Sequence, residues 1–226
     1  TSLSFHRCDL DDADLLRMVT TFKSIHTLRL TECANLTVIS LVHIYTHCAD
    51  SLHTLHLQRD LRVDGDIRLH FATVTTLLRK CIRLRNLHLS ECTAFVELPT
   101  FVFDFSLPNL TTLYLSGDTI TDECLASVST YCANLRHLSF IRPTPWIIYT
   151  DVGIDALASG CPLLQEVTLS RIASDTKSAT LGKIAASIAS WKAAKTNIVF
   201  HEIDSETIAK ITRLSGPLFD FFNVHV

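Results

Sequence analysis

Residues 132–140 of the chain read CANLRHLSF, and residues 161–169 read CPLLQEVTL. Both stretches begin with a cysteine and then follow the pattern Leu-x-x-Leu-x-Leu, with phenylalanine or valine replacing one leucine. In a strand, alternate side chains point to the same face, so the last two apolar residues of the pattern face a core. The residue between them faces the other way. The pattern therefore predicts short strands with one buried face.

The Leu-x-Leu triplet recurs along the chain. Its first residues are Leu3, Leu28, Leu55, Leu87, Leu113, Leu138, Val167 and Ile198. Successive triplets start 25, 27, 32, 26, 25, 29 and 31 residues apart, close to the upper end of the range of about 20–29 residues for leucine-rich repeats. Such a unit must stack on its neighbours to bury its apolar face. We therefore predict an α/β leucine-rich-repeat solenoid, curved, with a parallel β-sheet on the concave face and helices on the convex face.

Helices between the strands are predicted from caps and apolar spacing. Thr121 is placed to cap a helix that runs to Cys132, and acidic residues follow it in the first turn. Thr150 opens a similar helix that runs to Cys161. These two units predict helices of about 10 residues that lie against the strands.

The predicted domain organisation is one solenoid of seven to eight units over residues 1–214, with a C-terminal capping region from about residue 198. Residues 215–226 form an apolar tail, expected to fold back on the solenoid or to insert into a partner. Two units are irregular. The third has an insertion at residues 59–66, and residues 95–105 of the fourth contain a proline and many β-formers, which favours an extended or irregular segment over a helix.

Composition excludes several classes of protein. The chain has 226 residues, 47% hydrophobic residues and a formal net charge of −3, so disorder and a bulk basic field for nucleic acid are both excluded. No apolar run approaches the roughly 20 residues of a membrane-spanning helix. We expect no nucleic-acid partner, except through a local basic patch at residues 59–85.

The eight cysteines fit the repeat. Cys8, Cys33 and Cys92 follow the triplets, Cys48, Cys81, Cys132 and Cys161 close the helical segments, and Cys124 lies within a helix. No Cys-x-x-Cys pair is present, and small thiols are among the most buried side chains. We predict packing thiols and an intracellular location, cytoplasmic or nuclear, with mitochondrial or ciliary as the alternative.

The units Leu-x-x-Leu-x-Leu-x-x-Cys, the sequence Ile-Thr-Asp at residues 120–122 and the closing Cys-Pro-x-Leu at residues 161–164 resemble the cysteine-containing repeats of F-box/leucine-rich-repeat proteins. The resemblance covers residues 2–170 well and residues 171–214 weakly. It implies a module that recruits a protein substrate to a ubiquitin ligase. No F-box is recognisable in these residues, so that role would need one upstream of Thr1. The alternative is a structural subunit of a large ciliary, mitochondrial or ribosomal assembly.

The residues between the two apolar positions of each triplet form the candidate partner-binding stripe. They are Arg29, His56, His88, Tyr114, Ser139 and Thr168, with Ser4 at the N-terminal end. An arginine beside flat polar and aromatic side chains is typical of interaction hot spots. We therefore predict a non-catalytic protein-interaction module that recognises its partner through the concave face.

The sequence predicts no catalytic, metal-binding or cofactor-binding site. His43 and His47 have the i, i+4 spacing of a zinc site beside Cys48, but residue 44 is isoleucine where a zinc hydrolase motif has glutamate. Residues 60–66 fail the calcium-loop pattern, and no phosphate-binding glycine loop or nucleophile elbow occurs. We expect no enzyme activity, no metal and no cofactor. His56 and His88 are neighbours that could respond to pH.

Overall fold

The computed structural model describes residues 1–58, 67–90, 102–116, 120–141, 150–170, 186, 197–201, 209, 213 and 222–225. Nine strands form one sheet in these residues. They are β1 (Ser2–His6), β2 (Thr27–Thr31), β3 (Thr54–Gln58), β4 (Asn86–Ser90), β5 (Thr112–Ser116), β6 (His137–Ile141), β7 (Glu166–Ser170), β8 (Asn197–His201) and β9 (Phe222–His225). Residues 222–225, predicted from the sequence as part of an apolar tail, are therefore a ninth strand.

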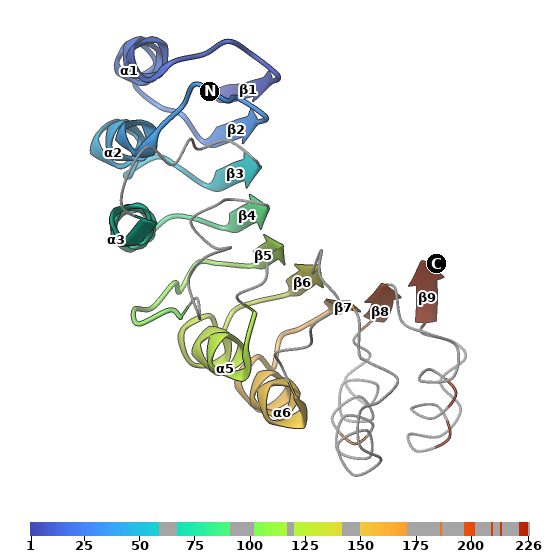
Figure 1. The fold of residues 1–226 in the computed structure, drawn as a ribbon. Coiled ribbons are helices and arrows are strands. Elements are labelled where there is room, and N and C mark those ends of the chain that lie inside the picture. Colours follow the sequence, from blue (N-terminus) through green and yellow to red (C-terminus); the bar gives the residue numbers. More distant parts are fainter. Residues whose placement is uncertain are drawn as a thin grey trace.

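All strands are parallel and follow one another in chain order. The order never reverses among these strands, so the described sheet lacks the switch point at which doubly wound folds bind nucleotides. Each triplet pairs with the next in strict register, with Leu28 beside Leu55 and Leu55 beside Leu87. The predicted alternation of parallel strands and helices is confirmed, and the sheet curves with the helices on its outer side (Figure 1).

The helices that the structure describes return the chain to the start of the next strand. They are α1 (Asp12–Thr21), α2 (Val38–His47), α3 (Ile67–Lys80), α5 (Asp122–Tyr131) and α6 (Asp151–Gly160). The Thr121 hydroxyl caps α5 by accepting from the Cys124 N–H at 3.3 Å, and Thr150 caps α6 by accepting from the Val152 N–H at 3.2 Å. Both predicted caps are confirmed.

Aspartates join the beginnings of neighbouring helices. The Asp122 carboxylate accepts hydrogen bonds from the Thr150 N–H at 2.6 Å, its hydroxyl at 2.7 Å and the Gly153 N–H at 3.0 Å. Asp12 accepts in the same way from the N–H and hydroxyl of Thr37 and from the Ser40 hydroxyl. Burial alone would raise the pKa of Asp12, but the bonds from Ser40 and Thr37 outweigh it and lower that pKa. In both cases, the carboxylate of one unit accepts hydrogen bonds from the first turn of the next unit's helix, where N–H groups have no partner within the helix.

Between β4 and β5 the structure describes residues 102–111, and none of these residues is helical. Residues 102–105, the described part of the segment predicted to be irregular at residues 95–105, are irregular, and so are residues 106–110. Phe103 is fully buried there, and its N–H donates to the Ser127 hydroxyl of α5 at 3.0 Å. Phe105 lies edge-on to it, with ring centroids 6.1 Å apart. The insertion at residues 59–66 and most of residues 95–105 lie outside the described residues.

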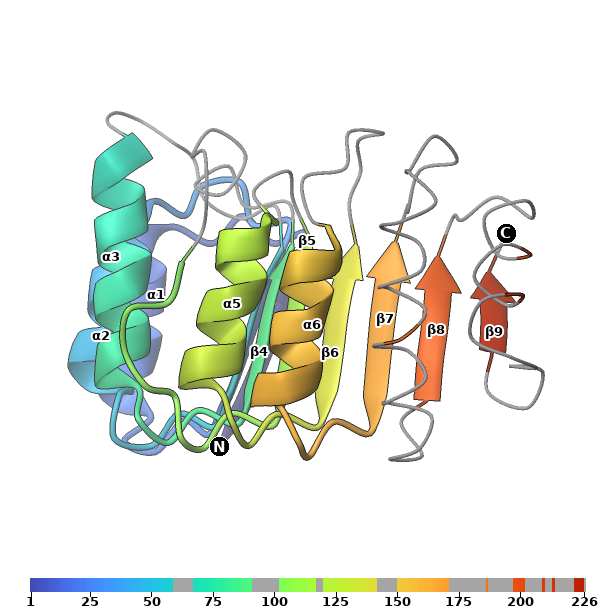
Figure 2. The same ribbon diagram turned by 90° about the horizontal axis from the view of Figure 1, so that it is seen from below.

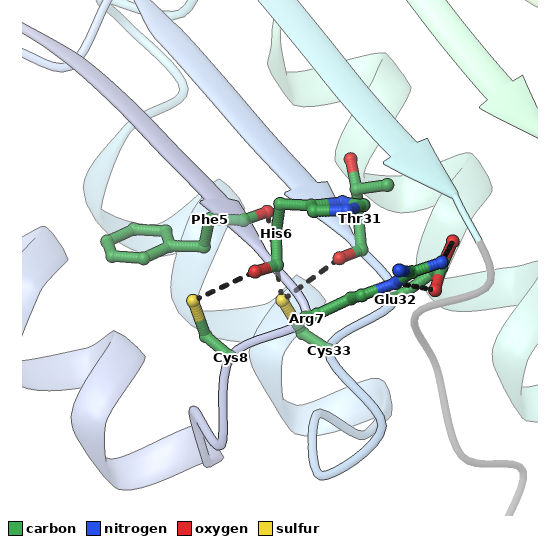
Figure 3. Close-up of polar contacts among 7 residues, drawn as sticks. All are labelled: Phe5, His6, Arg7, Cys8, Thr31, Glu32 and Cys33. Atoms are coloured by element: carbon green, nitrogen blue, oxygen red, sulfur yellow. Dashed lines mark hydrogen bonds and ion pairs between the residues drawn. The ribbon is translucent and has the colours of Figure 1, made fainter.

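The first turn after a strand holds the cysteines of β1 and β2 (Figure 3). Arg7 and Glu32 have positive φ at these turns, 51° and 56°, and the Arg7 Nε donates to a Glu32 carboxylate oxygen at 2.6 Å. Cys33 is buried between β1 and β2, with its thiol 3.9 Å from the Phe5 carbonyl. Cys8 is exposed. The prediction of burial is therefore wrong for Cys8, because no described strand lies beyond β1 to cover it.

The other thiols are buried. Cys33, Cys48, Cys81, Cys124, Cys132 and Cys161 all lie in the core, while Cys92 lies outside the described residues. Burial raises the pKa of Cys48 and Cys161 to about 11. Burial, helped by the neighbouring Cys48, raises the pKa of Cys81 to about 12. Only the thiolate is nucleophilic. These thiols are therefore protected from reaction for two reasons: reagents do not reach them, and they stay protonated at neutral pH.

We expect iodoacetamide to label Cys8 in the folded protein and the six buried thiols only after denaturation. The measurement is mass-spectrometric mapping of the labelled peptides in native buffer and in guanidinium. Cys8→Ser should remove the native label from its peptide and leave the denatured pattern of the other six unchanged. Native labelling of Cys132 or Cys161 at the rate of Cys8 would contradict the burial described above.

Candidate interaction surface on the concave sheet

The strand register places the predicted stripe in one continuous row. Arg29 pairs with His56, His56 with His88, His88 with Tyr114, Tyr114 with Ser139 and Ser139 with Thr168. All six predicted positions are thus neighbours on adjacent strands, which lie about 4.8 Å apart. The row belongs to the face without helices, because flanking residues such as Leu55, Leu57, Leu87 and Leu89 are buried and the helices lie on the outer side of the sheet (Figure 1). We call these six residues the concave row.

Three rings in the centre of the concave row form a stack. The centroids of His56 and His88 are 3.7 Å apart with an interplanar angle of 13°, and those of His88 and Tyr114 are 3.8 Å apart with an angle of 4°. The parallel register permits this arrangement, because every strand presents its ring at the same height. Stacked rings lose little further conformational entropy on binding, which is why rigid flat side chains suit recognition surfaces.

The two imidazoles are held neutral. Burial is the main cause of the lowered pKa of His56, which Gln58 opposes through a hydrogen bond and Arg29 reinforces through its charge. The pKa of His88 falls to about 4, mainly because of burial and further because of His56 and Arg29. The Nε2 atom of His56 is buried and has no hydrogen-bond partner among the described residues. An incoming donor or acceptor would satisfy it.

The ends of the concave row differ from its centre. Arg29 is exposed and forms no ion pair with any residue in the described part of the chain. Ser139 is half-buried, and Thr168 is buried, so Thr168 offers a partner less surface than its sequence position suggests. The available contact area is therefore concentrated on Arg29, the ring stack and Ser139.

A second row lies beside the first and was not predicted. It consists of the residues that open the strands: Thr27, Thr54, Asn86, Thr112, His137 and Glu166. The Asn86 amide donates to the Thr54 hydroxyl at 3.0 Å across adjacent strands. The sequence signal for this row is the polar residue immediately before each triplet, which strand alternation places on the same face as the concave row.

The metal hypothesis finds little geometric support. His43 and His47 lie on α2 and Cys48 caps its end, but the residues that the structure describes contain no cluster of three metal-binding side chains. His56 and His88 lie face to face, an arrangement that does not converge two ring nitrogens on one ion.

Among the described helices, none is both long and apolar enough to cross a bilayer.

No family model matches the chain, and a search of the curated proteins finds no significant match. The concave row is therefore interpreted from its own geometry.

The neutral ring stack predicts a loss of stability in acid. Between about pH 6.5 and 4 an unfolded imidazole is protonated, whereas folded His88, with its pKa lowered to about 4, is not. The unfolded state binds more protons in this window, so the free energy of unfolding falls as the pH falls through it. For a fully buried group, the lowering of the pKa from about 6.5 to about 4 corresponds to a loss of about 3 kcal/mol. Because His88 is only partly buried, solvent screening reduces the expected loss to about 1–2 kcal/mol.

Urea unfolding followed by circular dichroism at several pH values measures this loss. His88→Gln should flatten the curve between pH 6.5 and 4. The matched control His47→Gln removes an exposed imidazole from α2 and should leave the slope as in the parent protein. Equal slopes for His88→Gln and the parent would contradict the role given to His88.

Proposed function

We propose that the chain is a leucine-rich-repeat solenoid that binds a protein partner through the concave row and has no catalytic activity of its own. The supporting observation is the ring stack of His56, His88 and Tyr114 beside Arg29, which forms no ion pair with any described residue. Aromatic residues and arginine dominate the binding energy of protein interfaces, whereas scattered polar residues contribute little.

The repeat architecture supports the proposal independently of the row. Strands in sequential order and register build an extended curved surface, and such surfaces serve binding in repeat proteins. The resemblance to F-box/leucine-rich-repeat proteins adds a specific version, in which the partner is a substrate held for ubiquitination. In that version the concave row selects the substrate, and the ligase contact comes from another domain or subunit.

Site-specific photo-cross-linking tests the proposal. A benzophenone side chain is placed at Arg29 or Ser139 on the concave face, and at the exposed Arg17 or Thr46 on α1 and α2 as matched controls. We expect one protein to be cross-linked in cells from both concave positions and from neither helical position. Cross-links confined to the helical positions, or absent from Arg29 and Ser139, would refute concave-face binding.

Substitutions then test the row against the identified partner. His56→Ala, His88→Ala and Tyr114→Ala combined should weaken binding by about 100-fold, since hot-spot truncations cost about 2 kcal/mol or more each and are not additive. Circular dichroism must first show that the triple variant is folded. Arg29→Glu, at an exposed position, provides a second variant with little risk to folding. Unchanged affinity of both variants would place the binding site elsewhere.

A further inference from the structure

The amino ends of the strands form a rim that the proposed function does not use. Backbone hydrogen bonds join the residues of this rim from unit to unit: Arg85 N–H to the His53 carbonyl, Thr111 N–H to Arg85 and Arg136 N–H to Thr111, at 2.8 Å each. The tight turns after the helices lie at the same end of the molecule, at the bottom of Figure 2. We call these turns and rim residues, at 22–26, 48–53, 81–85, 106–111, 132–136 and 161–165, the amino rim.

The amino rim carries unpaired positive charge. Lys23, Arg83, Arg85 and Arg136 are all exposed, and none forms an ion pair or a side-chain hydrogen bond with any described residue. The only acidic residue within these six segments is Asp50. Three arginines outside the rim are paired: Arg7 with Glu32 at 2.6 Å, Arg17 with Asp14 and Arg79 with Asp104, each at 2.5 Å. Among the described arginines, the lack of an ion-pair partner is thus shared by Arg83, Arg85 and Arg136 of the rim and Arg29 of the concave row.

The same rim exposes large apolar side chains. Phe22 is 40% exposed, Ile82 58% and Leu163 44%. They account for three of the five large apolar residues that are exposed in the described part of the chain; the others, Ile39 and Val152, lie at the opposite ends of their helices. Phe22 adjoins Lys23, and Ile82 adjoins Arg83. Apolar side chains among unpaired charges are typical of an interaction surface.

The fold does not need these cations. The turns are fastened by amides instead: the Asn109 side chain donates to the Ile82 carbonyl at 2.8 Å, and the Asn134 side chain donates to the Pro108 carbonyl at 2.7 Å. The helices end in backbone bonds of their own, such as Cys132 N–H to the Val128 carbonyl at 2.9 Å. The side chains of Lys23, Arg83, Arg85 and Arg136 take part in none of these hydrogen bonds.

We propose that the amino rim binds an acidic segment of a partner protein that also carries apolar side chains. Carboxylates would pair with the guanidinium groups of Arg83, Arg85 and Arg136, and apolar residues would cover Ile82 and Leu163. The observations favour protein over RNA, because four cations are few for a phosphate backbone and the exposed apolar residues give a polyanion nothing to bind. This surface is separate from the concave row, so it can be tested without it.

Fluorescence anisotropy with a labelled 12-residue peptide of glutamate and leucine, two to one, measures the binding. Matched peptides replace every glutamate by glutamine or every leucine by serine, and a labelled 12-nucleotide uridine RNA is the competing probe. We expect the glutamate–leucine peptide to bind about 10-fold more tightly than either matched peptide. Equal binding of the three peptides, or tighter binding of the RNA, would overturn the proposal.

Exposed substitutions locate the site. Arg85→Gln with Arg136→Gln, and separately Ile82→Ser with Leu163→Ser, should each weaken binding of the glutamate–leucine peptide about 10-fold. The charge control is Arg79→Gln with Lys80→Gln on α3, and the apolar control is Ile39→Ser with Val152→Ser at the other end of the helices. Both controls should leave the affinity unchanged. A loss in the controls equal to that in the rim variants would refute the rim as the site.

Discussion

Replacing Phe103 by alanine should lower the free energy of unfolding by about 3–5 kcal/mol. Phe103 is the largest fully buried side chain of the irregular segment at residues 102–110. A cavity there cannot close easily, because the segment is anchored by the hydrogen bond from the Phe103 N–H to Ser127. The change removes the ring but leaves this bond in place.

Urea titration followed by circular dichroism measures the effect, with Phe103→Leu as the control that keeps most of the apolar volume. We expect the leucine variant to lose less than about 2 kcal/mol. The half-buried Phe105, which Arg79 covers at 5.1 Å, should tolerate alanine better than Phe103 does. A loss for Phe103→Ala no larger than that for Phe105→Ala would contradict the role of Phe103 as the main buried side chain of this segment.

Gly160→Ala should destabilise the protein by about 1–3 kcal/mol, although alanine is the better helix former by about 1 kcal/mol. A Cβ atom at Gly160 would lie 2.6 Å from both the Cβ and the carbonyl oxygen of Ser129, on the neighbouring α5. Backbone atoms cannot yield without moving the helix. The glycine thus sets how closely the end of α6 approaches α5.

Neighbouring positions provide controls for this substitution. Ser159→Ala changes an exposed residue one position earlier and should alter the free energy of unfolding by less than about 0.5 kcal/mol. At Gly153 the nearest atoms are the tips of the Asp122 and Leu125 side chains, at 2.5 and 2.7 Å, so Gly153→Ala should cost less than Gly160→Ala. Thermal unfolding of the three variants gives the order. A neutral Gly160→Ala would contradict the close approach of the helices.

Much of the architecture can be predicted from the sequence because the same triplet pattern occurs eight times along the chain. The triplets fix strand position and register, and Thr121 and Thr150 fix helix starts through their own hydroxyls. The ninth strand was not predicted, because Phe222–His225 lacks the leucine triplet and follows a glycine–proline pair. The exposure of Cys8 was not predicted because it depends on whether another strand covers β1, which a local pattern does not record.

The candidate surface was predictable as a row but not as a stack. Strand alternation alone identifies Arg29, His56, His88 and Tyr114 as outward residues. The face-to-face rings and the lowered pKa of His88 require the register and burial of the folded sheet. The amino rim was not predicted for another reason. Its residues are spread over six turns along the chain, and they come together only when the units stack.

The sequential strand order has a consequence for biosynthesis. Because each described strand pairs with the strands that come directly before and after it in the chain, an early unit can bury its leucines as soon as the next one has left the ribosome. A sheet whose first and last strands were paired would have to wait for the whole chain. Here the growing end of the stack is always the most recently synthesised strand, so each new strand covers the edge left by the strand before it.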